Sequence, residues 1–177
     1  LEGEKAWTNF DDILEVEEDL ISYMVNNVAE RRYKELEALG RDPEDLKKVT
    51  APFDRIPYDE VIKFLQQKGK EIKFGDDLGT DEERLLTMSS DKPIFIYGCP
   101  KAIKPFYTKI DPKNENMVLS ADMIAPRGFG EISTGGQREE NLETIVDRIK
   151  ADGFNPQDYS WYLDLRRYGS VPHSGFG

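Results

Sequence analysis

The stretch Gly130–Glu139, GEISTGGQRE, places an acid in a strand-like run and an arginine seven residues later, across two glycines. Polar and apolar residues alternate from Glu131 onward, which predicts a β-strand. We expect Gly135 and Gly136 to let the backbone turn sharply and approach a ligand, and Arg138 to open a helix. Because a guanidinium donates two parallel hydrogen bonds to a carboxylate or phosphate, the pattern indicates a site for a charged or amide-bearing small molecule. A plain turn followed by a solvated arginine is the alternative.

A second stretch, residues 159–177, reads YSWYLDLRRYGSVPHSGFG and carries the only histidine, His173. Together with GEISTGGQRE it resembles the end of the catalytic domain of class II aminoacyl-tRNA synthetases of the aspartyl, asparaginyl and lysyl group, with wording nearest the asparaginyl branch. The resemblance covers almost the whole chain. Further segments that look like successive parts of that domain are PFDRIPYDEVIKFL (52–65), FGDDLGTDEERLL (74–86), PIFIYGCPKAIKPFYTK (93–109) and ADMIAPRGFGEISTGGQRE (121–139).

The charge of the chain limits what it binds by itself. Its 177 residues hold 24 Lys and Arg against 35 Asp and Glu, a formal net charge of −11, which argues against broad contact with a polyanion. If the chain serves a tRNA, the main grip lies elsewhere, and related synthetases carry a separate anticodon-binding barrel. The single cysteine, Cys99, excludes an internal disulfide framework and fits a reducing compartment. With no apolar run of roughly 18 residues, we expect no membrane contact and a cytoplasmic protein.

The apolar pattern predicts one domain of the α+β class, an antiparallel β-sheet flanked by helices. From Ile13 to Val28 apolar residues recur at three- and four-residue steps, which indicates an amphipathic helix over residues 9–39, capped by Asn9. An inserted helical region should occupy 52–90, and the sheet with the C-terminal helices 93–177. The further expected elements are helices 57–67 and 81–88, a strand in PIFIYG (93–98), a hairpin tip at 114–116, paired strands 117–124 and 130–134, and helices 138–151 and 156–167. The resemblance implies the catalytic-core fold of class II synthetases.

Two carboxylates, Asp122 and Glu131, are expected near the ends of neighbouring antiparallel strands, where they converge on one Mg²⁺ ion. In the resembled family, acids at these positions hold magnesium against ATP. The family implies that Arg138 reads the amino-acid side chain, with Thr134 and Gly135 beside the substrate. His173 and Gly175 would line the adenosine pocket. A surface acid pair on a hairpin is the structural alternative for the two carboxylates.

The resemblance implies ATP-dependent activation of asparagine and its transfer to tRNA(Asn), with ATP and Mg²⁺ as cofactors and a homodimer as the assembly. The dimer-forming first signature and the ATP-gripping second signature of the family would lie before Leu1, and the arginine of the third after Gly177. We therefore expect this chain to be part of the catalytic domain and inactive alone. The alternatives are an aspartyl-tRNA synthetase, an ATP-dependent asparagine synthetase of the same fold, and a non-catalytic synthetase-like binding module.

Overall fold

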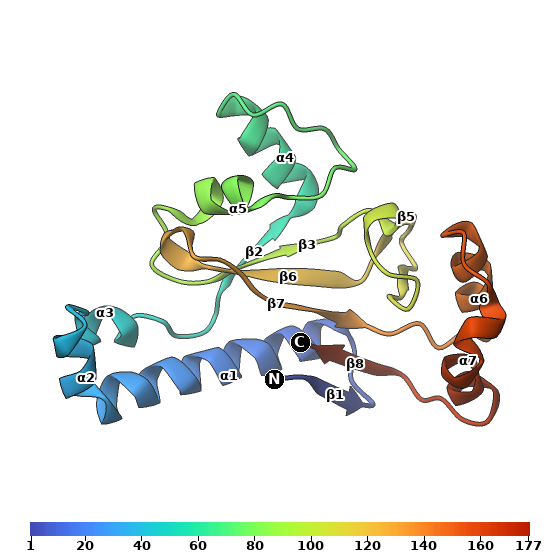
Figure 1. Cartoon of the computed structure of the whole chain (residues 1–177), viewed down its shortest axis with the longest axis horizontal. Helices are drawn as coiled ribbons and strands as arrows, with labels where there is room; N and C mark the ends of the chain where they lie inside the picture. Colours follow the sequence, from blue (N-terminus) through green and yellow to red (C-terminus); the bar gives the residue numbers. More distant parts are fainter.

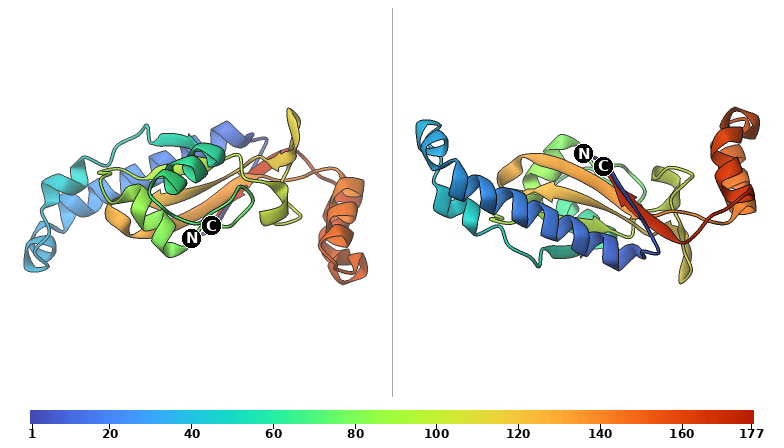
Figure 2. Two further views of the ribbon diagram at one scale, coloured as in Figure 1. Left: turned by 90° about the horizontal axis from the view of Figure 1, so that it is seen from above. Right: turned by 90° about the horizontal axis from the view of Figure 1, so that it is seen from below.

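A computed structural model describes all 177 residues, and its centre is a six-stranded sheet in the order β1-β8-β7-β6-β3-β2. Neighbouring strands run antiparallel except β2 and β3, which are parallel. Helix α1 lies under the sheet, α4 and α5 lie above it, and α6 and α7 stand apart at one end (Figure 1). The views from above and below show the same arrangement, with the two chain ends close together (Figure 2). The α+β class with a mostly antiparallel sheet is therefore confirmed.

Most helices and strands are of the type predicted from the sequence, although several begin or end at other residues. The strands are β1 (Gly3–Ala6), β2 (Asp54–Pro57), β3 (Ile94–Tyr97), β4 (Ile110–Asp111), β5 (Asn114–Val118), β6 (Ser120–Ala125), β7 (Gly130–Gln137) and β8 (His173–Phe176). The α-helices are α1 (Phe10–Arg31), α2 (Tyr33–Ala38), α3 (Pro43–Lys47), α4 (Tyr58–Gln67), α5 (Thr80–Thr87), α6 (Leu142–Ala151) and α7 (Ser160–Arg167). Short 3₁₀ turns are η1 (Lys101–Ile103), η2 (Pro126–Gly128) and η3 (Pro156–Tyr159).

The sheet is buried on both faces, which explains the unbroken apolar run of β3. Ile94 and Ile96 pack with α4 in one core cluster, whereas Phe95 packs with α1 in another. Successive side chains of a strand point to opposite faces, so a strand covered on both sides is apolar at every position. Along β6 the same alternation directs Met123 toward α1 and Ile124 toward α4.

Helix α1 begins as expected and ends early. Asn9 and Asp12 form a capping box, with the Asn9 side chain accepting from the Asp12 N–H at 3.0 Å. The expected single helix to Leu39 is wrong, because the backbone leaves helical geometry at Arg32 and a separate α2 follows. The apolar stripe stops at Val28, and α2 buries none of its side chains. Ala29 is the last buried residue of α1, and beyond it the chain turns.

The hairpin expected at 114–116 lies two residues earlier. Strands β4 and β5 pair antiparallel, with Asp111 opposite Asn114, so Pro112 and Lys113 form the tip. Residues 114–116 belong to β5, and the paired strands that follow are β6 and β7, as the sequence predicts. Proline fixes the backbone angle φ near the value that a turn requires, so Pro112 favours the observed tip. The prediction relied instead on Asn114 and Asn116, because asparagine is also common in turns.

The two glycines of GEISTGGQRE do not form a turn. Gly135 and Gly136 lie inside β7, paired on one side with β6 and on the other with β8. A Cβ on Gly135 would come within 2.6 Å of Glu17 Oε1 and 2.9 Å of Phe176 Cβ, and one on Gly136 would collide with the Leu119 carbonyl. Both positions are glycine because neighbouring chains pass too close for a side chain.

The expectation that Arg138 opens a helix is wrong for the same reason. Arg138 extends β7 and bridges to Thr108, and α6 begins only at Leu142, where the Asn141 side chain accepts from the Thr144 N–H at 2.9 Å. Helices α6 and α7 share a small core of their own, formed by Ile145, Ile149 and Leu163. No helix of the structure combines the length and the apolar character needed to cross a membrane.

Replacing Gly136 with alanine should destabilise the protein by about 1–3 kcal/mol, because the new methyl group meets backbone that cannot move aside. Gly169→Ala is the matched control, since its Cβ would meet only the Leu165 carbonyl, at 3.7 Å. Urea unfolding of both variants measures the difference. Equal midpoints would mean that β7 has room that the structure does not show.

Candidate active site

A cavity of about 1000 Å³ opens on the α5 side of the sheet, where β7, β1 and the loop between β3 and β4 meet. Its walls come from parts of the chain that are far apart in sequence, from Glu2 to Gly177. Three of the residues predicted from sequence line its wall: Glu131, Thr134 and Arg138. Gly135 lines it through its backbone.

A β-bulge decides which way Glu131 points. Ser133 pairs with Met123 on β6, but Ile124 pairs with Glu131, so β7 has one extra residue, Ile132. Without the bulge, alternation would direct Glu131 toward α1. With it, Glu131 shares the face of Ile124 and Asp122, which is the face of the cavity.

Asp122 is not a free carboxylate. Both of its oxygens lie 2.6 Å from the Lys104 ammonium, and the Thr134 hydroxyl donates to Oδ1. Both charged side chains of the Asp122–Lys104 pair are almost buried, at 13% and 12% exposure. Burial is the largest influence and lowers the pKa of Lys104, but Asp122, Cys99 and Glu131 together raise it by more, so that the pKa is raised. Lys104 is thus the charge partner of Asp122, a role that no sequence signal indicated. Asp122 also lies within β6, not near its end as expected.

Glu131 carries a carboxylate with no cationic partner of its own. Its backbone N–H donates to Glu83 Oε2 at 3.1 Å, which brings a second acid beside it. Burial raises the pKa of Glu131, and the nearby Asp122 raises it further. Burial likewise raises the pKa of Glu83. Such crowding of carboxylates favours a cation at this place.

Arg138 lies between an acid and an aromatic ring. Its Nη2 is 2.6 Å from Glu4 Oε1, its Nε donates to the same oxygen at 3.0 Å, and its guanidinium lies 5.4 Å from the ring centre of Tyr107. The arginine side chain is largely buried, at 15% exposure, whereas Glu4 is 55% exposed. The buried guanidinium of Arg138 is held in place, whereas the exposed Glu4 carboxylate is free to move. A ligand can therefore replace Glu4 as the hydrogen-bond acceptor of the guanidinium.

Gly175 has a structural reason to lack a side chain. It pairs with Gly136 in β7 and with Glu4 in β1, and a Cβ there would collide with the Glu4 carboxylate. His173 lies at the start of β8, with its Nδ1 2.8 Å from the Val171 carbonyl oxygen. Phe176 and Gly177, not His173 or Gly175, form the β8 part of the cavity wall. The adenosine-binding role of His173 and Gly175 stays a prediction.

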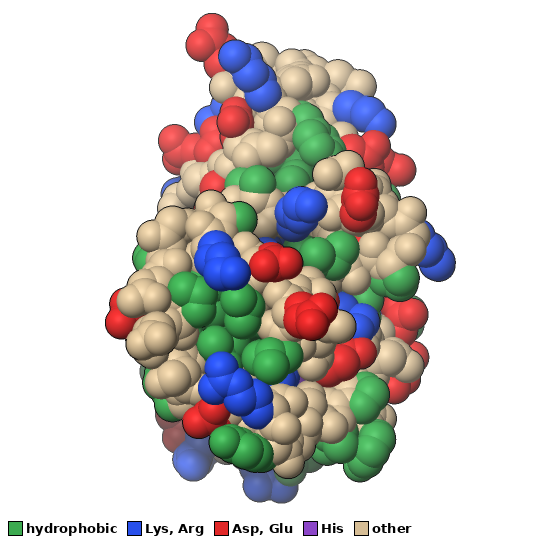
Figure 3. Space-filling model, turned by 90° about the vertical axis from the view of Figure 1, so that its right-hand side faces the viewer, with side chains coloured by type: hydrophobic (Ala, Val, Ile, Leu, Met, Phe, Trp, Pro, Cys, Tyr) green, Lys and Arg blue, Asp and Glu red, His purple; other side chains and the backbone are tan.

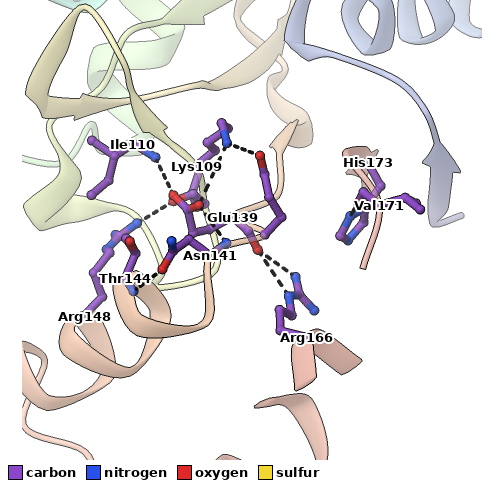
Figure 4. Close-up of polar contacts among 11 residues, drawn as sticks. Lys109, Ile110, Glu139, Asn141, Thr144, Arg148, Arg166, Val171 and His173 are labelled. Carbon is purple, nitrogen blue, oxygen red and sulfur yellow. Dashed lines mark hydrogen bonds and ion pairs between the residues drawn. The ribbon is translucent and has the colours of Figure 1, made fainter. Parts of the chain in front are cut away.

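Glu139 anchors the α6 and α7 unit beside the cavity (Figure 4). One carboxylate oxygen accepts from the Asn141 N–H at 3.1 Å and the other from the Ile110 N–H at 3.4 Å. The Glu139 carbonyl accepts from Arg166 through two nitrogens, at 3.2 and 3.1 Å. Arg166 is therefore structural, and His173 lies apart from this network (Figure 4).

The outer face over α6 and α7 carries both signs of charge with hydrophobic side chains between them, and neither sign covers it (Figure 3). Cys99 is buried, and burial raises the pKa of its thiol to about 12, so it is no nucleophile. No group of three or more His, Cys, Asp or Glu side chains is placed to hold a metal ion. A cation at Glu131 would take its other ligands from water and from a bound molecule.

A family model described as tRNA synthetases class II (D, K and N) matches residues 1–177. The chain belongs to this family. Asparagine–tRNA ligase of Pyrococcus abyssi is 56% identical over 177 residues, which are all of this chain and 41% of the relative. The synthetase chain thus spans about two fifths of the length of that curated relative.

Solved structures agree with this family assignment. Asparaginyl-tRNA synthetase from Pyrococcus horikoshii matches 99% of the synthetase chain with a TM-score of 0.95 and 54% identity, and the match covers 42% of the solved chain. The same enzyme complexed with asparaginyl-adenylate matches 99% of this chain with a TM-score of 0.94 and 54% identity, covering 40% of the solved chain. The class II catalytic-core fold is therefore confirmed.

Removing Lys104 should destabilise the synthetase chain through the charge it leaves behind. Lys104→Met leaves the nearly buried Asp122 carboxylate unpaired, which costs about 3–5 kcal/mol in comparable buried pairs. The double variant Lys104→Met/Asp122→Asn should recover more than half of that loss. A double-mutant cycle by urea unfolding measures the coupling, and additive effects of the two substitutions would contradict the pairing.

Proposed function

We propose that this chain forms the amino-acid and ATP site of an asparaginyl-tRNA synthetase. The observation that supports it most is that Glu131 and Thr134 of β7, and Arg138 just after it, face one cavity of about 1000 Å³. In the proposed reaction the asparagine carboxylate attacks the α-phosphorus of ATP, giving asparaginyl-adenylate and pyrophosphate. The asparaginyl group then passes to the terminal ribose of tRNA(Asn).

The proposed amino-acid pocket lies around Arg138. Its guanidinium donates to the side-chain oxygen of asparagine, and the Tyr107 ring keeps the fork in place. Glu4 touches the same guanidinium, and Glu2 lines the same cavity. A carboxamide offers an N–H to these carboxylates, whereas the carboxylate of aspartate would meet like charge. This charge arrangement supports asparagine over aspartate.

ATP and Mg²⁺ are the proposed cofactors. Glu131 fits a magnesium ligand, because its carboxylate lacks a cation and its neighbours are acids. Asp122, already balanced by Lys104, would support the ion at longer range or exchange its partner. When bound, the ion would offset charge on the phosphates as it develops. Thr134 and Gly135 would contact the substrate, and His173 and Gly175 the adenosine side. The work of the protein is then positioning and charge balance, because the nucleophile is the substrate's own carboxylate.

The remaining parts of the proposal concern the whole protein. tRNA(Asn) would be held mainly outside this acidic chain, and the enzyme would be a homodimer acting in the cytoplasm, where the ribosome uses its product. The name of the relative from Pyrococcus abyssi and the adenylate in the Pyrococcus horikoshii complex support asparagine as the substrate.

The decisive experiment is pyrophosphate exchange by the full-length protein. The synthetase proposal expects exchange with asparagine and none with aspartate, and charging of tRNA(Asn). Exchange with aspartate alone would indicate an aspartyl enzyme, and free asparagine made from aspartate and ammonia without tRNA would indicate an asparagine synthetase. Absence of both ATP and asparagine binding in calorimetry would leave only a binding module.

Arg138→Lys should lower asparagine activation by roughly tenfold to a thousandfold, because lysine keeps the charge but loses the paired planar donors. Thermal stability should stay within about 1 kcal/mol, since the partner Glu4 is more than half exposed. Pyrophosphate exchange across asparagine concentrations measures the first effect and a melting curve the second. Unchanged exchange, or simple unfolding, would make Arg138 a structural arginine.

Glu131→Gln should weaken magnesium-dependent ATP binding while the fold stays intact, because the change removes charge and keeps shape. In the wild type that binding should decline as pH falls toward the raised pKa of Glu131, since only the ionised form attracts the cation. The variant should lack this decline. Titration of ATP with Mg²⁺ at several pH values measures both, and Asp122→Asn should show the smaller defect. Equal affinities for wild type and Glu131→Gln would refute the assignment.

A further inference from the structure

Glu17 is an acid buried under the strand that carries the proposed site. It lies on the sheet-facing side of α1 and is 2% exposed. Its Oε2 accepts from the Ser133 hydroxyl at 2.7 Å, whereas its Oε1 is buried and has no hydrogen-bond partner. One hydrogen bond does not compensate an ionised carboxylate removed from water. Geometry alone therefore favours protonation of Glu17 at a higher pH than for an exposed glutamate.

The contact reaches the part of β7 that faces the cavity. Glu17 Oε1 occupies the space where a side chain of residue 135 would stand, 2.6 Å from an ideal Cβ on Gly135. Ser133 and Gly135 enclose Thr134, which points to the cavity and hydrogen bonds to Asp122. On the α1 side the carboxyl group thus packs against Ser133 and Gly135, the two residues that flank Thr134 of the proposed amino-acid pocket.

Two charged groups on other elements act on Glu17, and both belong to the site. Burial is the largest influence and raises the pKa of Glu17 to about 7, while the Ser133 hydrogen bond lowers it. The Arg138 guanidinium on the extension of β7 also lowers it, and the Asp122 carboxylate on β6 raises it. The small cavity beside Glu17, of about 210 Å³, is lined by no other charged side chain.

We propose that Glu17 is a positioning residue for the amino-acid pocket, holding β7 in its substrate-binding place while protonated and releasing it when ionised. The inference rests on the proposed function. An ionised Glu17 would be stabilised by drawing water into the small cavity or by moving away from β7. Either change shifts Thr134 and Arg138, and small misplacements of substrate-contacting groups are costly.

The first test compares wild type and Glu17→Gln in the full-length protein by pyrophosphate exchange over pH. Glutamine keeps the shape and an acceptor for Ser133 but does not ionise. The KM values for asparagine should agree within about twofold near pH 6, and the wild-type value should be about fivefold higher than that of the variant near pH 8.5, with kcat little changed. The ratio of the two KM values at each pH removes the effect of other groups that titrate equally in both proteins.

Glu18→Gln is the matched control. Glu18 is the next residue of α1 and is also buried, but it accepts from the Phe53 N–H at 3.2 Å and lies near Arg55, away from β7. This variant should retain the pH dependence of the wild type. Ser133→Ala, which removes the other half of the contact, should raise KM for asparagine severalfold with kcat preserved. A pH-independent ratio of wild type to Glu17→Gln would overturn the inference.

A second measurement does not depend on activity. The folded-state pKa of Glu17 lies above that of the unfolded chain, so the wild type loses stability as pH rises toward about 7. Glu17→Gln should therefore melt at a higher temperature than wild type near pH 8.5 and at a similar one near pH 5. Equal melting temperatures at both pH values would refute the protonated carboxyl. A wild type that activates no asparagine would instead refute the proposed function, and the positioning role with it.

Discussion

Strand β7 passes between α1, β6 and β8 with no room for a side chain at two successive positions, and the site depends on this close approach. Gly135 lets α1 bring Glu17 against the strand, and Gly136 lets the backbone of Leu119 and Ser120 come close. Because the strand is fixed from three directions, the residues on its cavity face are held by backbone packing. Backbone packing is therefore enough to place three side chains on one cavity wall, those of Glu131, Thr134 and Arg138.

The charged side chains in and around the cavity are unevenly balanced. Asp122 is matched by Lys104, and Arg138 is matched by the more exposed Glu4. Glu131 and Glu83 are left with raised pKa values and no cation. A site of this kind is prepared for a cation on one side and for a polar, hydrogen-bonding side chain on the other. The acidic character of the whole chain, at −11, does not prevent this, because the site is set by local pairs.

The motif GEISTGGQRE, together with residues 159–177, indicated the family but led to a wrong local structure. Its glycines suggested a turn and its arginine a helix start, since Gly-Gly between polar residues commonly marks such places. In the structure all of these residues extend one strand. Glycine in a strand has a second cause, close approach of another chain, and which cause applies depends on neighbours more than a hundred residues away, such as Glu17.

The sequence alone determined the fold class, the apolar strand β3 and the capped start of α1, because each of these depends on local pattern or on a motif. Of the predicted site residues, Glu131, Thr134, Gly135 and Arg138 line the cavity, and their roles stay predictions. Only the tertiary structure decided that the bulge at Ile132 directs Glu131 into the cavity and that Lys104 holds Asp122. It also decided that Glu4 meets Arg138 and that Glu17 lies against Ser133 and Gly135. These contacts join segments distant along the chain, and their energies come from burial and charge pairing, which no single stretch of sequence contains.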